Sequence, residues 1–123
     1  MFLCIDGGPA KAAIIAALNE ADIPFVDTGM GIDLIDGALS GILRVTTASR
    51  GRREHVRQRI PVATGDANND YGKNIQIADL NALNAALAVI KWKKLFSFYA
   101  DLEHEHHCSY TTDGNAMSNS ETP

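Results

Sequence analysis

The sequence lacks several features that would point at once to a class of protein. It has only two cysteines in 123 residues and no Cys-x-x-Cys pair, so neither a thiolate zinc site nor a disulfide framework is expected. No Gly-x-Gly-x-x-Gly loop occurs, which disfavours a dinucleotide-dependent oxidoreductase. There is no signal peptide, and the longest apolar run, around residues 85–90, is far shorter than the roughly 20 residues of a membrane span.

An excess of positive charge is also missing. The 11 Lys and Arg residues are outnumbered by 15 Asp and Glu residues, and the resulting net charge of −4 disfavours a general nucleic-acid-binding protein. The hydrophobic content of 46% and the length fit one soluble domain with a modest core. Two isolated thiols are typical of a reducing compartment, so we expect a cytoplasmic protein with no nucleic-acid or membrane partner.

What the sequence does contain is a βαβ pattern near its start. Residues 2–5 and 23–26 are short apolar runs, and residues 9–19 form an alanine-rich segment that begins with a proline, as many helices do. The residues that follow the two apolar runs are Asp6-Gly7-Gly8 and Asp27-Thr28-Gly29-Met30-Gly31. Ligands of open α/β sheets bind at the carboxyl ends of the strands, so we expect these residues to line a ligand site.

The remainder of the sequence predicts a hairpin, two helices and a β-rich tail. The expected elements are hairpin arms at 32–35 and 42–46 with a turn at 36–41, a basic helix-competent segment at 49–60, a loop at 63–73, a long helix at 74–103, and short strands at 108–112 and 116–117. We expect one domain over residues 1–117 and a flexible tail over 118–123. The predicted fold class is α/β: a partial Rossmann-like domain whose small mixed sheet is flanked by helices.

The order of these elements resembles the ThiF/MoeB/HesA family, which includes the adenylation domains of ubiquitin-activating enzymes. The resemblance rests on Cys4-Ile5-Asp6-Gly7, the alanine-rich helix, Ile23-Pro24-Phe25-Val26, Gly29-x-Gly31 with its hairpin, and the long helix after Asn74. It covers most of this chain but only the C-terminal portion of the family domain. Gly7 departs from the pattern, since the family usually has asparagine there.

The resemblance implies ATP-dependent adenylation of the C-terminal carboxylate of a ubiquitin-like or sulfur-carrier protein, by a homodimer. It makes Asp6 the catalytic residue and the Mg²⁺ ligand, and it assigns nucleotide binding to Asp6, Gly7, Gly8, Asp27 and Gly29. The family's phosphate loop, ribose-binding acid, arginine and lysine precede the equivalent of Asp6, and this chain contains none of them. We therefore expect the chain to be inactive alone and to be completed by a missing N-terminal half.

Each candidate residue also has a plainer structural explanation. Asp6 could cap the helix that begins at Pro9, and Gly7 and Gly8 could serve turn geometry alone. The residues after the second strand could form no more than a strand-exit turn. Gly31, like Gly29, is open to both explanations.

Three other clusters are expected to be structural or incidental. The arginines between Arg44 and Arg59 have no interleaved aromatic residues and are interpreted as a solvated helix face. The Glu-His-Glu-His-His run at 103–107 could bind zinc or nickel, but we interpret it as a flexible surface segment. Cys4 is expected in the core and Cys108 as a spare thiol.

Two other functions stay open. The first is a non-catalytic dimerisation or protein-interaction module with the same scaffold. It is favoured by an aromatic-rich helix end that we expect to be buried against a partner subunit, at Trp92, Phe96, Phe98 and Tyr99. The second is a fragment of a dinucleotide-dependent oxidoreductase, which the strand-end glycines fit only loosely.

Overall fold

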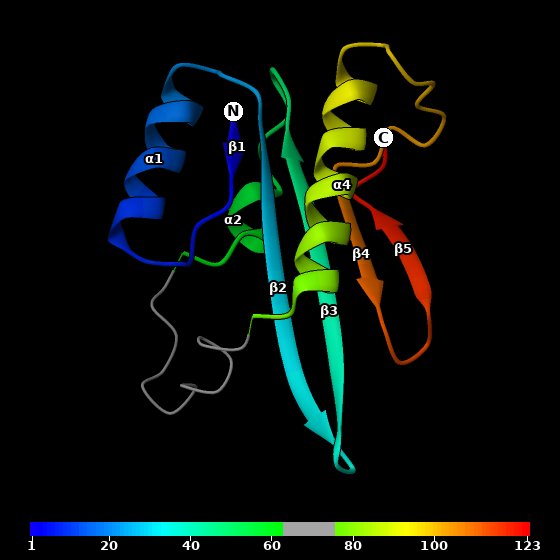
Figure 1. Ribbon diagram of the computed structural model, residues 1–123. Helices are drawn as coiled ribbons and strands as arrows, with labels where there is room; N and C mark the ends of the chain where they lie inside the picture. Colours follow the sequence, from blue (N-terminus) through cyan, green and yellow to red (C-terminus); the bar gives the residue numbers. More distant parts are fainter. Residues whose placement is uncertain (63–75) are drawn as a thin grey trace.

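A five-stranded mixed sheet forms the centre of the molecule, in a computed structural model that describes residues 1–62 and 76–123. The predicted βαβ unit is confirmed: β1 (Phe2–Leu3) pairs in parallel with β2 (Phe25–Ile35), and α1 (Pro9–Glu20) connects them (Figure 1). Gly8 precedes α1 with φ of 149°, a backbone conformation that favours glycine. Pro9 then supplies the first turn of the helix, where a missing N–H costs nothing.

Strand β2 is longer than the sequence predicts. It runs without interruption over 11 residues and pairs along its full length with the antiparallel strand β3 (Ala38–Ala48). The expected loop at 27–31 is therefore wrong, as is the six-residue turn. A two-residue turn joins the strands at Asp36 and Gly37, whose φ values of 49° and 81° suit a tight hairpin. Cross-strand hydrogen bonding outweighs the weak strand propensity of Gly and Asp here.

Both remaining helices are shorter than expected. Only Val56–Arg59 of the basic segment is helical (α2), because the residues before it form an irregular stretch tied to β3 and α1 by side-chain hydrogen bonds. Helix α4 (Ala78–Leu95) stops well before residue 103, and Ser97 has a positive φ of 62° just after it. The whole predicted loop, residues 63–73, lies outside the described residues.

The sheet is completed by the antiparallel strands β4 (His107–Thr111) and β5 (Ala116–Ser120), in the order β1-β2-β3-β4-β5. Strand β5 includes residues 118–120, for which the sequence predicts a flexible tail. The β2–β3 hairpin extends well past the neighbouring strands (Figure 1). No helix in the described part of the chain is long and apolar enough to cross a membrane.

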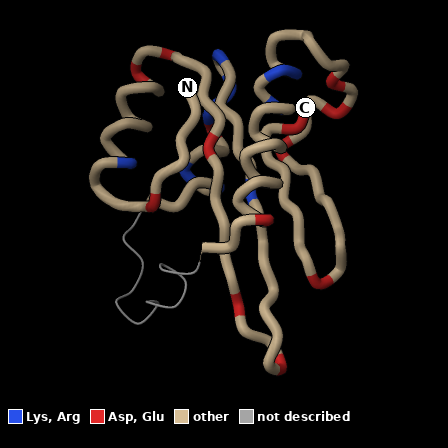
Figure 2. The backbone as a smooth tube through the Cα atoms, in the orientation of Figure 1, with Lys and Arg blue, Asp and Glu red and all other residues tan. Residues whose placement is uncertain are grey.

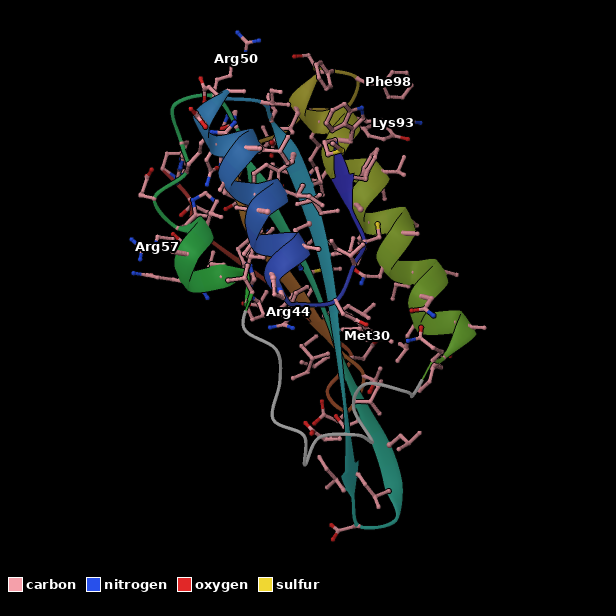
Figure 3. The ribbon with its side chains drawn as sticks, turned by 90° about the vertical axis from the view of Figure 1, so that its left-hand side faces the viewer. Met30, Arg44, Arg50, Arg57, Lys93 and Phe98 are labelled. Atoms are coloured by element: carbon pink, nitrogen blue, oxygen red, sulfur yellow. The ribbon has the colours of Figure 1, made fainter. Side chains whose placement is uncertain are left out.

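The helices cover both faces of the sheet, with α1 and α2 on one side and α4 on the other (Figure 3). The core under α1 and α2 consists of Leu3, Ile15, Leu18, Phe25, Ala48, Val56 and Ile60. A second buried cluster under α4 is built on Val26, Val45 and Ala88. Consecutive residues of β2 therefore contribute to opposite layers, as expected for a strand buried on both faces.

Candidate functional site

A cleft of about 800 Å³ opens at the carboxyl end of β1. Its lining comes from the β1–α1 connection, the middle of β2 and β3, α2 and the N-terminal half of α4. Strand β1 ends at Leu3, whereas β2 continues for eight residues beyond their last shared pair, Leu3 with Asp27, so the cleft wraps around the part of β2 that β1 leaves uncovered. Arg44 and Met30 lie on opposite sides of β2 (Figure 3), and both line the cleft.

Asp6 lies at the mouth of this cleft, where the sequence placed a ligand-binding carboxylate. Its side chain is exposed, and it forms no ion pair or hydrogen bond with any residue that the structure describes. The alternative role as a helix cap is not observed, because Gly8 is the N-cap residue of α1 and no side chain caps that helix. The Asp6 carboxylate is therefore available to a cation or a polar ligand.

Only some of the other residues that the sequence analysis assigned to the site line the cleft. Gly7, Asp27 and Gly29 line the cleft, whereas Gly8 and Gly31 do not. Gly8 instead has the turn geometry that the plainer explanation proposed. Asp27 and Gly29 reach the cleft from within a strand and not from a loop at its end.

The sequence analysis missed the partner of Asp27. Lys11 Nζ, from the first turn of α1, lies 2.8 Å from Asp27 Oδ1, and both side chains are about 95% buried. Burial raises the pKa of Asp27, although Lys11 and then Arg44 act to lower it. At this distance the Lys11 ammonium neutralises the Asp27 carboxylate and occupies its Oδ1. The one lysine in an otherwise apolar helix could have indicated this pair.

Asn84 contributes a second polar group that sequence analysis missed. Its Nδ2 donates a hydrogen bond to the Gly29 carbonyl oxygen at 3.1 Å, which ties α4 to the cleft-lining part of β2. Its Oδ1 is buried without a hydrogen-bond donor in the described parts of the chain. Asn84 lies on a helix face that the sequence predicts to be apolar, and its position among alanines and leucines is the only indication the sequence offers.

The arginines near the cleft have distinct surroundings. Arg59 Nε lies 2.8 Å from Glu121 Oε1, and Arg53 Nε lies 2.9 Å from Asp22 Oδ1. Arg50 and Arg57 point into solvent (Figure 3). The projecting end of the β2–β3 hairpin, residues 32–42, has only acidic residues, Asp33 and Asp36, at its charged positions (Figure 2). The cations that line the cleft therefore come from α1, β3 and α2.

The prediction of a flexible histidine-rich surface is wrong. Glu105, His106 and His107 are at least 93% buried. His106 Nδ1 donates to the His104 carbonyl oxygen at 3.0 Å, so its Nε2 accepts the hydrogen bond from Ser49 Oγ at 2.8 Å. These contacts use the ring nitrogens internally, and no cluster suited to a metal ion exists among the described residues.

The predictions for the cysteines and for the aromatic residues near the end of α4 have different outcomes. Cys4 is exposed and lines the cleft, so its assignment to the core is wrong. Burial raises the pKa of the Cys108 thiol, which is consistent with an unreactive cysteine. Trp92 packs on Phe2 within the chain, at a centroid distance of 5.2 Å. Phe96 and Phe98 remain exposed, and their burial against a partner stays a prediction.

No protein-family profile matches this chain, and no curated protein is significantly similar to it in sequence.

Proposed function

We propose that this chain forms the C-terminal portion of an ATP-dependent adenylyltransferase domain of the ThiF/MoeB/HesA type. The domain would activate the C-terminal carboxylate of a ubiquitin-like or sulfur-carrier protein in the cytoplasm. The observation that carries the proposal is Asp6, a carboxylate without a partner in the described part of the chain, in a large cleft at the carboxyl end of a parallel strand pair. In Rossmann-like domains this edge binds the nucleotide.

The residues present fit a magnesium ion in part. Asp6 is a hard oxygen ligand without a protein partner in the described chain, and Mg²⁺ typically binds one or two carboxylates together with substrate phosphates. When bound, Mg²⁺ would neutralise negative charge on phosphate oxygens during attack by the carrier carboxylate. Asp27 is already paired with Lys11, so we assign it to shaping the cleft and not to holding the metal.

The test uses Mn²⁺ as a paramagnetic substitute for Mg²⁺ in nuclear magnetic resonance spectra of the ¹⁵N-labelled chain with ATP. We expect selective broadening of the amide signals around Asp6, and its loss in Asp6→Asn. Asp33→Asn is the matched control, because Asp33 is an exposed carboxylate on β2 that does not line the cleft. Equal broadening in the wild type and Asp6→Asn would remove Asp6 from the site and contradict the proposal.

A second candidate function is a dimerisation or interaction module. It is favoured by large apolar side chains that stand in solvent at the projecting hairpin, where Leu34 is 73% and Leu39 54% exposed. Sedimentation velocity distinguishes the candidates. A stable dimer without ATP-dependent broadening near Asp6 favours the module, and a monomer with that broadening favours the adenylyltransferase.

A further inference from the structure

One cation in the cleft has no partner among the residues that the structure describes. Arg44, on β3, is half-buried and lines the cleft, yet its guanidinium makes no ion pair or hydrogen bond with any described residue. The other two cleft cations are neutralised, Lys11 by Asp27 and Arg59 by Glu121, each at 2.8 Å. A guanidinium has five N–H donors in a fixed planar arrangement, and no described residue accepts a hydrogen bond from those of Arg44.

The position of the guanidinium depends on Gly29. The two residues face each other across the β2–β3 ladder. A Cβ atom built on Gly29 would lie 3.2 Å from Arg44 Nη2, 3.3 Å from Nε and 3.5 Å from Cζ. Nη2 and Nε are nearer than Cζ, so the edge of the guanidinium that carries these two nitrogens faces the glycine. The missing side chain at Gly29 therefore provides the space in which Arg44 rests.

The charges left over in the cleft suggest what it binds. Once the two ion pairs are set aside, Asp6 and Arg44 remain in the same cavity as groups of opposite charge without a partner in residues 1–62 and 76–123. The structure shows no ion pair between them. A ligand that combines a cation with an oxyanion would satisfy both groups, and a planar guanidinium matches the paired oxygens of a carboxylate or phosphate.

We propose that Arg44, resting on Gly29, is the oxyanion-binding residue of the cleft. The inference rests on the proposed function, because it assigns the second charged end of the same ligand site. The oxyanion is either a phosphate group of the nucleotide or the C-terminal carboxylate of the carrier protein. Both would be bound by two parallel N–H···O hydrogen bonds from the guanidinium.

The test is an anion titration without divalent metal, at constant ionic strength, followed by the Arg44 Nε–H and Gly29 amide signals. Inorganic phosphate is the first probe. We expect saturable shifts in the wild type, about tenfold weaker binding in Arg44→Lys, which keeps the charge but loses the planar fork, and no saturation in Arg44→Gln. Arg50→Gln is the control, because Arg50 is exposed and does not line the cleft.

A second variant tests whether the missing side chain at Gly29 positions the Arg44 guanidinium. Gly29→Val places methyl groups where the guanidinium lies, and it should weaken phosphate binding while the protein stays folded, since β-branched residues suit strands. Thermal unfolding checks the fold, and the milder Gly29→Ala replaces it if Gly29→Val unfolds. Unsaturable shifts in the wild type, or equal affinity in the wild type and Arg44→Gln, would overturn the proposal. So would an equal loss in Arg50→Gln.

Two further probes identify the source of the oxyanion. A peptide that ends in Gly-Gly is compared with its C-terminal amide, and both are compared with pyrophosphate. Tighter binding of the free-acid peptide assigns Arg44 to the carrier carboxylate, and tighter binding of pyrophosphate assigns it to the nucleotide. These anions are tested without divalent metal, so the titration does not depend on Asp6 as a metal ligand. Failure of the Mn²⁺ experiment with success here would therefore reject the magnesium site and leave the oxyanion site standing.

Discussion

Two regions of the molecule are rich in charge, and they use it in opposite ways. Beside the C-terminal half of α4, Lys91 Nζ lies 2.8 Å from Asp101 and 3.6 Å from Glu105, and Lys94 lies 3.3 Å from Glu105. We call this group, with His106 and His107, the α4 network. Nearly all its polar atoms are paired, although Glu105 Oε2 is buried without a partner in the described chain.

In the cleft at the carboxyl end of β1, by contrast, Asp6 and Arg44 have no partner among the described residues, and Asn84 Oδ1 is buried there without a hydrogen-bond donor. Buried polar groups are ordinarily satisfied, so this atom, beside two charged groups without described partners, is the observation that favours a ligand in the cleft. The comparison teaches that the pairing of charged residues, and not their density in the sequence, separates a structural cluster from a binding site.

The largest expected effect tests the α4 network. Lys91→Met removes the 2.8 Å cation contact of Asp101 and one of the two cation contacts of Glu105, and it should lower the free energy of unfolding by about 3–5 kcal/mol. Urea denaturation measures the change. Lys93→Ala, on the same helix without an ion pair, should cost less than about 1 kcal/mol. Equal losses in the two variants would show that the network contributes no more than an ordinary surface group.

Breaking the ion pair between Lys11 and Asp27 in the cleft should destabilise the protein less than Lys91→Met does. Lys11→Met leaves Asp27 buried without the cation that pairs with it, and we expect a loss of about 2–3 kcal/mol in the free energy of unfolding. Replacing both residues, as Lys11→Met with Asp27→Leu, should recover most of that loss, because the uncompensated charge is removed. If the double variant is as unstable as the single one, the loss does not come from the uncompensated charge of Asp27. The contrast between the cleft and the α4 network would then be weakened.

The next effect is a pH dependence of stability from the histidines. Burial lowers the pKa of both His106 and His107, so between the lowered values and about 6.5 the unfolded chain binds more protons than the folded one. Stability should therefore fall as the pH drops below about 6.5, by at most about 1.4 kcal/mol per pH unit for each histidine.

Urea midpoints from pH 7.5 to 5.5 measure this slope. His106→Gln combined with His107→Gln should flatten it, whereas His104→Gln, at an exposed position, should leave it unchanged. A slope that survives the double substitution would place the titration elsewhere.

The smallest expected effect concerns Asp6. An exposed carboxylate without a described protein partner contributes little to folding, so Asp6→Asn should change the free energy of unfolding by less than about 0.5 kcal/mol. The same urea experiment measures it. A loss well above that value would give Asp6 a structural role and weaken the contrast between the cleft and the α4 network.

Much of the local structure could be predicted from the sequence. Pro9 marks the start of α1, the Asp36-Gly37 pair marks the hairpin, and the leucine and isoleucine spacing marks α4. The ends of elements were less predictable. The sequence predicted that the second strand ends at residue 26, because Gly and Asp have low strand propensity. In the structure, β3 supplies hydrogen bonds along all of β2.

The candidate site was predictable in the same partial way. Asp6 follows directly from the position of a carboxylate after an apolar strand. Lys11, Arg44 and Asn84 do not, because each reaches the cleft from a different element. The buried histidines were misjudged for a related reason: their partners, such as Ser49 and Thr46, lie more than 50 residues away in the sequence.

The sequence by itself determined the elements whose causes are local: a proline-started helix, a glycine-containing turn, alternating apolar runs and the carboxylate after the first strand. The tertiary structure alone decided which charges are neutralised. An ion pair such as Lys11 with Asp27 forms only when packing brings a helix and a strand together. The physical reason is that local propensity acts over a few residues, whereas the desolvation and pairing of charges depend on the completed fold.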